Sequence, residues 1–161
     1  MLIYLRDTTL ASLGAQEEHL VPMRPNRRER NRSMSVLFGY IAVFFGAGIG
    51  GLLRHAANRA GVHLGLSFPW STLCVNVSGS LAIGLIAGWL AHRGQPGQTL
   101  RLFLTTGILG GYTTFSAFAL DTALLWERGQ IWGSASYVAS SVLLSLVGVF
   151  LGLAIIRQLA S

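Results

Sequence analysis

The amino-acid sequence predicts an all-α membrane protein that crosses the bilayer four times. Of its 161 residues, 52% are hydrophobic and 11% are charged, and the mean hydropathy is +0.54. A soluble domain carries about 25% charged residues, so this balance indicates a membrane protein. The sequence also holds four apolar runs, each near the ~20 residues that a helix needs to cross the hydrocarbon core. We expect these helices over residues 35–53, 70–91, 102–126 and 131–156.

The first run is rich in glycine and holds no acidic residue. Gly46, Gly48, Gly50 and Gly51 remove side-chain bulk, which favours close packing against a neighbouring helix. A transporter coupled to a cation would normally need an acid there, so its absence argues against that class. Before the run, residues 1–33 contain the basic stretch MRPNRRERNR and lack the apolar core of a secretory signal. We interpret residues 1–33 as a disordered or untranslated tail, and residues 34–161 as the membrane domain.

The second and fourth runs each carry a stripe of polar residues. In the second run, Thr72, Asn76 and Ser80 recur at a spacing of four, which places them on one helical face. An amide in hydrocarbon is costly unless its hydrogen bonds are satisfied, so Asn76 either joins two helices or donates to an anion. The stripe of the fourth run consists of Tyr137, Ser141 and Ser145, followed by Gly148 and Gly152. Two facing stripes are better evidence of a polar pathway than one.

The third run contains the stretch GILGGYTTFSAFALD, which is poorly suited to a continuous helix. We expect the helix to unwind near its midpoint, around Gly107, Gly110, Gly111, Thr113 and Thr114. Unwound backbone at membrane depth must be buried in protein or line a polar cavity, where its carbonyl groups become ligands for a cation. Two phenylalanines then follow three residues apart. They either pack in the core or present their electropositive ring edges to an anion.

The connections between the runs hold most of the remaining polar residues. They cover residues 54–69, 92–101 and 127–130, and tryptophans stand near the expected helix ends, as interfacial anchors do: Trp70, Trp89, Trp126 and Trp132. The single Cys74 excludes an intrachain disulfide and a cysteine-based metal site. All four histidines fall in the tail or the loops, and no nucleophile stands with a base. An enzyme is therefore the least expected class.

Several motifs together resemble the Fluc, or CrcB-type, fluoride channels. The residues that carry the resemblance are GGLLRH, WSTLCVNVSGS, TTGILGGYTTFSAFALD and the late serines, and it extends from Met34 to about Arg157. Proteins of this family are four-helix homodimers of dual topology, with two antiparallel fluoride pores and a central structural Na⁺. The resemblance implies the same architecture here, with the third helix broken at mid-membrane.

The resemblance also assigns roles to individual residues. Asn76 resembles the pore asparagine, and Phe115 and Phe118 resemble the paired pore phenylalanines. The carbonyl groups of Gly110 and Thr113 match those that hold Na⁺. The polar track of the last helix corresponds to Tyr137, Ser141 and Ser145, and we also expect Thr72 to donate in the pore. Where many relatives have glutamate, this chain has Asp121, which we place in a vestibule.

The implied function is passive export of fluoride across the inner membrane, which gives fluoride resistance. Its expected partners are the fluoride ion, a second copy of the chain and the lipid bilayer, and no nucleic acid is expected. A four-span multidrug exporter would share the size and the dual topology, but the first run lacks its acid. A non-transporting assembly factor would use the glycines for packing only, and Asn76, Phe115 and Phe118 would then tolerate conservative substitution.

The distribution of arginines supports dual topology independently of the family. Orientation follows the bias of Lys and Arg in short loops. The first and third loops hold Arg54, Arg59 and Arg128, whereas the opposite side of residues 34–161 holds Arg93, Arg101 and Arg157. This balance gives no preferred orientation, so we expect both orientations and an antiparallel dimer. The arginines of residues 1–33 would remove the balance, which is one reason to expect that translation starts at Met34.

Overall fold

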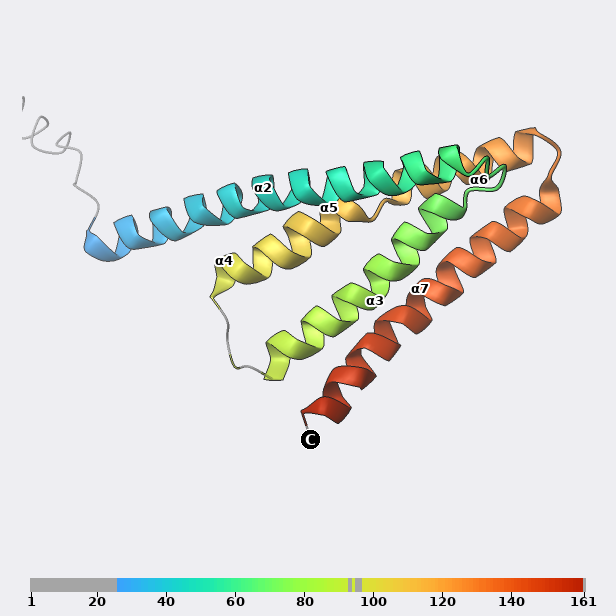
Figure 1. Cartoon of the computed structure of the whole chain (residues 1–161). Helices are drawn as coiled ribbons and strands as arrows, with labels where there is room; N and C mark the ends of the chain where they lie inside the picture. Colours follow the sequence, from blue (N-terminus) through green and yellow to red (C-terminus); the bar gives the residue numbers. More distant parts are fainter. Residues whose placement is uncertain (1–25, 93, 95–96, 161) are drawn as a thin grey trace, which may run out of the picture. The chain divides into compact units, whose positions relative to one another are not determined.

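The computed structural model describes residues 26–92, 94 and 97–160 (Figure 1). The chain divides into two units, residues 1–34 and 35–161. Within the described residues, four helical segments are long and apolar enough to cross a membrane, as the sequence predicts. The elements in chain order are α2 (Arg27–His63), α3 (Trp70–His92), α4 (Gln98–Arg101), η2 (Leu102–Leu109), α5 (Gly110–Tyr112), α6 (Phe115–Glu127) and α7 (Ile131–Leu159).

The first helix is longer than the sequence analysis expects at both ends. Residues 54–63, expected in a loop, form the last turns of α2, so His55 and His63 are helical rather than in a loop. The helix stops because Gly65 adopts a positive φ of 64°, which a residue with a side chain rarely accepts. Leu66 N then donates to Gly61 O and Gly65 N donates to Val62 O, a pattern that ends many helices.

The start of α2 also precedes the expected one. Residues 27–33, expected within the tail, are helical, and the rest of that expectation concerns residues 1–25, which lie outside the described residues. The other spans agree more closely with the apolar runs. Both α3 and α7 begin at the expected residues, and His92 closes α3 rather than starting a loop. Trp70, Trp126 and Trp132 lie at or near helix ends.

Glycines let the helices of the second unit approach at their backbones. A methyl group on Gly46 would stand 2.8 Å from the Gly107 Cα atom, and one on Gly111 would stand 2.9 Å from the Ala47 Cα atom. A methyl group on Gly50 would likewise overlap with the Ile108 carbonyl oxygen. Two small-xxx-small pairs, one on α2 and one on the third span, therefore face each other.

Helices α3 and α7 pack side by side along their length (Figure 1). Their glycines again permit the approach, since a methyl group on Gly152 would meet Leu85 N at 2.7 Å and one on Gly88 would meet Ile156 Cβ at 2.9 Å. The two polar stripes of the sequence analysis are on these two helices. The glycines at the end of each stripe lie in this contact.

The third span consists of four segments rather than one regular helix. Residues Leu102–Leu109 wind as a π-helix, a wider form that is uncommon and often found near functional sites. Gly107, Gly110 and Gly111 are helical, although they were expected to be part of the unwound region. The extended backbone is confined to Thr113 (φ −77°, ψ 157°) and Thr114 (φ −153°, ψ 117°).

Candidate functional site

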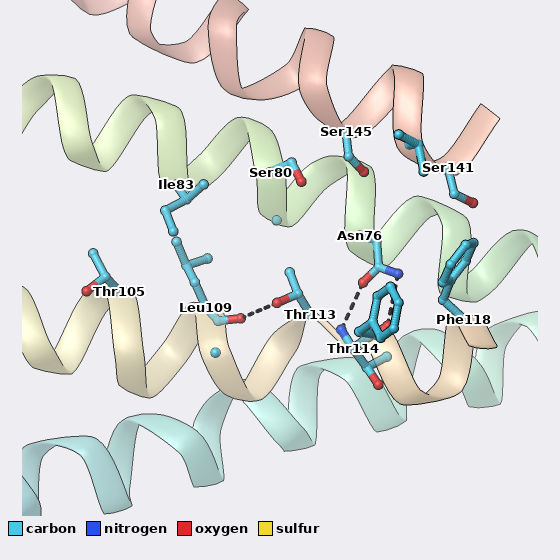
Figure 2. A pocket seen from close by; sticks show the side chains of 14 residues that line it. Asn76, Ser80, Ile83, Thr105, Leu109, Thr113, Thr114, Phe118, Ser141 and Ser145 are labelled. Atoms are coloured by element: carbon cyan, nitrogen blue, oxygen red, sulfur yellow. Dashed lines mark hydrogen bonds between the residues drawn. The ribbon is translucent and has the colours of Figure 1, made fainter. Parts of the chain in front are cut away.

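A cavity of about 410 Å³ lies among α3, α7 and the third span, beside the extended residues (Figure 2). It brings together most of the residues that the sequence analysis selects. Among the described residues that line it, none is charged, and the lining set is Asn76, Gly79, Ser80, Ile83, Thr105, Leu109, Gly110, Thr113, Thr114, Phe115, Phe118, Ser141, Val142 and Ser145. The predicted Thr72, Tyr137 and Asp121 are not in this set.

Asn76 pairs with the extended backbone of the third span. Its Nδ2 donates to the Thr114 carbonyl at 3.1 Å, and its Oδ1 accepts from Thr114 N at 2.8 Å (Figure 2). Because a backbone N–H only donates and a carbonyl only accepts, these two bonds fix the orientation of the amide. Of the two interpretations open for Asn76, joining helices is therefore part of its role. One of its two amide hydrogens is used in this way.

Threonine hydroxyls end α5 and start α6. Thr113 Oγ1 and Thr113 N both donate to Leu109 O, each at 2.9 Å. Thr114 is the N-cap of α6, and its Oγ1 accepts from Ala117 N at 3.2 Å. The interruption is therefore built from defined hydrogen bonds.

These bonds redirect two donors that a continuous helix would use. Thr114 N would bond to the Gly110 carbonyl in an α-helix, but it donates to Asn76 Oδ1 instead. Ala117 N would bond to the Thr113 carbonyl, but it donates to Thr114 Oγ1. The carbonyl groups of Gly110 and Thr113 thus lose their regular helical donors. Both residues also line the cavity.

The two phenylalanines have different surroundings. Their ring centroids are 5.5 Å apart with an angle of 48° between the rings. Phe118 is half-buried and packs on Tyr137, with a centroid distance of 5.4 Å. Phe115 is 80% exposed on the single chain. Core packing therefore accounts for Phe118 in part but does not account for Phe115.

Tyr137 and Thr72 are buried and do not line the cavity. Tyr137 is fully buried and belongs to a core cluster with Leu73 and Leu125. Its hydroxyl donates to Asp121 Oδ2 at 3.3 Å. Asp121 itself lines a separate cavity of about 200 Å³, together with Arg128 and the α2–α3 loop. Of the predicted polar track, Ser141 and Ser145 line the first cavity, whereas Tyr137 lines neither cavity.

Ser141 carries a buried polar atom in the cavity wall. Its side chain is 5% exposed, and Ser141 Oγ lies beside the Tyr137 hydroxyl without a well-formed hydrogen bond to it or to another described residue. Buried hydroxyl groups normally have a partner, so this atom suits a ligand that accepts a hydrogen bond. Ser145 of the same helix and Ser80 of α3 line the same cavity (Figure 2).

Apart from Ser80, which belongs to the predicted polar stripe, two polar lining residues were not predicted as site residues, Thr105 and Thr114. Thr114 could have been recognised as an N-cap, because a threonine before an apolar helical segment is a common start signal. Thr105 has no comparable local signal, since its Oγ1 bonds back to Arg101 O of its own helix. Among the described residues there is no group of three or more His, Cys, Asp or Glu side chains that could hold a metal ion.

The fold and the cavity define a small multi-pass helical membrane protein with an uncharged polar site. The chain belongs to the CrcB family, because the family model described as "CrcB-like protein, Camphor Resistance (CrcB)" matches residues 41–153. Proteins named fluoride-specific ion channel FluC are similar to it. FluC 2 of Nitrobacter hamburgensis is 55% identical over 121 residues, which cover 74% of this chain and 98% of the relative.

Two further relatives carry the name FluC and have similar identity and coverage. FluC of Rhodopseudomonas palustris (strain BisB5) is 55% identical over 121 residues, with 74% of this chain and 98% of the relative covered. FluC of Granulibacter bethesdensis is 49% identical over 124 residues, with 76% and 98% covered. The relatives are thus covered almost completely, whereas about a quarter of this chain lies outside each match.

Proposed function

We infer that this chain is a fluoride-specific ion channel of the bacterial inner membrane. The observation that carries the inference is the uncharged cavity, which combines amide and hydroxyl donors with two phenyl rings. The names of the relatives, at about 55% identity over nearly their whole length, point to the same ion. An ion channel is not an enzyme, in agreement with the sequence analysis. Passive flow removes fluoride that enters as neutral HF and dissociates inside the cell.

The cavity can replace the hydration of a small anion without a fixed positive charge. A pore must offer enough donors for fluoride to enter, but no site so favourable that the ion stays. The second amide hydrogen of Asn76 and the hydroxyl of Ser141 are suitable donors. Ring edges of Phe115 and Phe118 add weak contacts. Ser145 and Ser80 extend the donor set toward the glycine end of the helix pair.

A second copy of the chain completes the pore in this proposal. Phe115 and Gly110 line the cavity but are exposed on the single chain, which supports a partner at that face. The partner is antiparallel in a form that starts at Met34, because the arginines of residues 34–161 are balanced three against three and give insertion of that form no preferred orientation. The break at Thr113 and Thr114 then lies at mid-membrane. Asp121 serves a vestibule, which is compatible with its place in a separate cavity.

The central Na⁺ is also a proposal, and the residues present fit it. The carbonyl groups of Gly110 and Thr113 lack their regular helical donors, and carbonyl oxygen is a suitable ligand for a hard cation. The same two residues from the second copy would complete the set. The ion would supply positive potential at the dimer centre, where no carboxylate lines the cavity.

Two other functions remain as outcomes of the test. A multidrug exporter would need an acidic residue to couple drug to proton, and none of the described residues that line the cavity is acidic. A non-transporting assembly factor would need no donor facing a cavity, so the amide and hydroxyl groups that line the cavity argue against it.

The proposed function is tested by ion efflux from liposomes that contain the purified chain. We expect fluoride to leave without a proton gradient, and far faster than chloride. Equal rates for the two halides, or a strict need for a proton gradient, would contradict a fluoride channel. Absence of flux from correctly inserted dimers would favour the assembly factor.

A further inference from the structure

The described residues of the first unit include an arginine-rich helical segment with a defined start. Asn26 and Glu29 form a reciprocal cap, in which Glu29 N donates to Asn26 Oδ1 and Asn26 N donates to Glu29 Oε2, both at 2.9 Å. Such a capping box satisfies two backbone donors that a helix start leaves open. Residues 27–33 are therefore specified as helix by their own sequence. They also lie outside the family match, which begins at residue 41.

The charge of this segment is strongly positive. Arg27, Arg28, Arg30 and Arg32 stand against the single acid Glu29, whose carboxylate is used in the cap. Arg27 and Arg30 are three residues apart and Arg28 and Arg32 are four apart, so each pair shares a helical face. All four side chains are exposed. We call residues 27–32 the arginine segment.

The apolar run of the first membrane span begins only a few residues after the arginine segment, within the same helix α2. The uncharged run from residue 34 to residue 53 is long enough by itself to cross the ~30 Å hydrocarbon core. Part of α2 must therefore continue outside the core. Because the run from residue 34 to residue 53 carries no charge, the arginine segment is the part that meets the headgroups on its side.

We propose that the arginine segment binds the anionic lipid headgroups of the cytoplasmic leaflet and holds the start of α2 on that side of the membrane. Clusters of four or more arginines next to a membrane helix are attracted to anionic headgroups. A nucleic acid would also attract arginines, but a segment so close to the start of a membrane span is confined to the bilayer surface.

In this proposal, the arginine segment also determines the orientation of the full chain in the membrane. Counted with the arginine segment, the side that carries the chain termini holds seven arginines in residues 27–161, and the opposite side holds three. The positive-inside bias then favours a cytoplasmic N-terminus. Where the antiparallel dimer proposed above holds, its second subunit is a chain of the same fold that lacks the arginine segment, such as a form that starts at Met34.

Orientation is measured with two cysteine reporters, after replacement of the single native cysteine by Cys74→Ser. Ser67→Cys reports on the α2–α3 loop and Ala160→Cys reports on the opposite side; both native residues are exposed. Intact cells are treated with a membrane-impermeant thiol reagent. We expect the full chain to be labelled almost completely at residue 67 and not at residue 160. A form that starts at Met34 should be labelled in part at both.

Matched variants separate charge from other properties of the segment. Arg27→Gln with Arg28→Gln and Arg30→Gln should give partial labelling at both reporters, whereas the corresponding three Arg→Lys substitutions should keep the pattern of the full chain. Partial labelling of the unmodified full chain at both reporters would overturn the proposal. So would an Arg→Gln variant that keeps a single orientation. Neither outcome depends on fluoride flux, so failure here is distinguishable from failure of the proposed channel.

The lipid is tested on the purified full chain in nanodiscs, with trypsin cleavage in the arginine segment as the readout. We expect cleavage to be at least about tenfold slower in discs that contain phosphatidylglycerol than in discs of phosphatidylcholine alone, with the difference lost at high salt. Equal cleavage in both discs would overturn the proposal. Protection by added RNA or DNA, but not by anionic lipid, would also overturn it and assign the segment to nucleic acid.

Discussion

Asn76 shows how one polar side chain can serve structure and function together. Its Oδ1 replaces, for Thr114 N, the backbone carbonyl that a continuous helix would supply, and its Nδ2 adds a bond to the Thr114 carbonyl. The bonds join residues 38 positions apart in the sequence and hold the interruption against α3. The same amide retains a second hydrogen at the cavity that we assign to fluoride. A change at this position should therefore affect both the pore and the extended backbone.

Asn76→Asp should reduce fluoride flux by at least about tenfold, which corresponds to ~1.4 kcal/mol in the barrier. The carboxylate can still accept from Thr114 N, but it cannot donate to the Thr114 carbonyl, and its charge repels the anion. Liposome efflux measures the effect. Ser78→Ala is the control, because Ser78 is on the same helix and bonds to Tyr112 away from the cavity. Unchanged flux in Asn76→Asp would limit Asn76 to a structural role.

Phe115→Ile and Phe118→Ile should both lower fluoride flux strongly, because each removes an electropositive ring edge. Their effects on stability should differ. Phe118 packs on both Tyr137 and Phe115, so its loss should cost about 0.5–1.5 kcal/mol for each ring pair, whereas the exposed Phe115 should lose only its contact with Phe118. Flux and thermal unfolding in detergent measure the two effects. Wild-type flux in both variants would show that the two rings serve packing and not fluoride conduction.

At the scale of elements, glycine pairs decide which helices approach at their backbones. Gly50 on α2 and Gly111 on α5 stand where any side chain would meet the neighbouring backbone. Gly48, in the same apolar run, has open space around it, since a methyl group added there would meet nothing within 4 Å. The glycines of the first run therefore are not equivalent, although the sequence shows them as one cluster. Packing of this kind matters in lipid, where the hydrophobic effect does not drive helices together.

Gly50→Ala and Gly111→Ala should each destabilise the fold by about 1–3 kcal/mol, because an added methyl group overlaps with backbone that cannot move aside easily. Gly48→Ala is the matched control and should be neutral or slightly stabilising. Thermal unfolding of the purified protein measures all three. A similar loss in the control would indicate that helix flexibility, rather than close packing, explains these glycines.

At the scale of the whole molecule, the proposed dimer depends on groups that a single chain leaves incomplete. Phe115 and Gly110 border the cavity and are exposed, and the carbonyls of Gly110 and Thr113 have lost their helical donors. A second antiparallel copy would cover the exposed Phe115 and Gly110. A Na⁺ shared by the two copies would bind the carbonyl groups of Gly110 and Thr113. Assembly, ion binding and pore formation are then one event rather than three.

Sodium should therefore stabilise the purified dimer. A ligand present at about 100 times its Kd contributes ~2.7 kcal/mol, which raises the melting temperature by several degrees. The measurement compares thermal unfolding in Na⁺ with that in a large organic cation at equal ionic strength. Asp121→Asn should keep the sodium effect, because the proposed ligands are carbonyls. Identical melting curves in the two cations would contradict a bound Na⁺.

The sequence by itself determined the helical class, the four spans and most of the residues around the cavity. Spans α3 and α7 begin at the expected Trp70 and Ile131 because apolar runs and their polar ends are local signals. The spacing of four predicted that Asn76 and Ser80 share a face, as Ser141 and Ser145 do, and the structure places all four around one cavity. The end of α2 was missed although the signal was present, since Gly65 is a helix-ending glycine.

Only the tertiary structure decided where the third span is interrupted and which polar residues meet. Glycine propensity pointed to Gly107, Gly110 and Gly111, but all three are helical, and Gly107 and Gly111 pack against α2. The interruption occurs at Thr113 and Thr114, where the Asn76 side chain of α3 bonds to Thr114 N and to the Thr114 carbonyl. Likewise, Tyr137 is buried against Leu73 and Leu125, and Asp121, which accepts its hydrogen bond, lines a different cavity. Such contacts join distant segments, so no local pattern contains them.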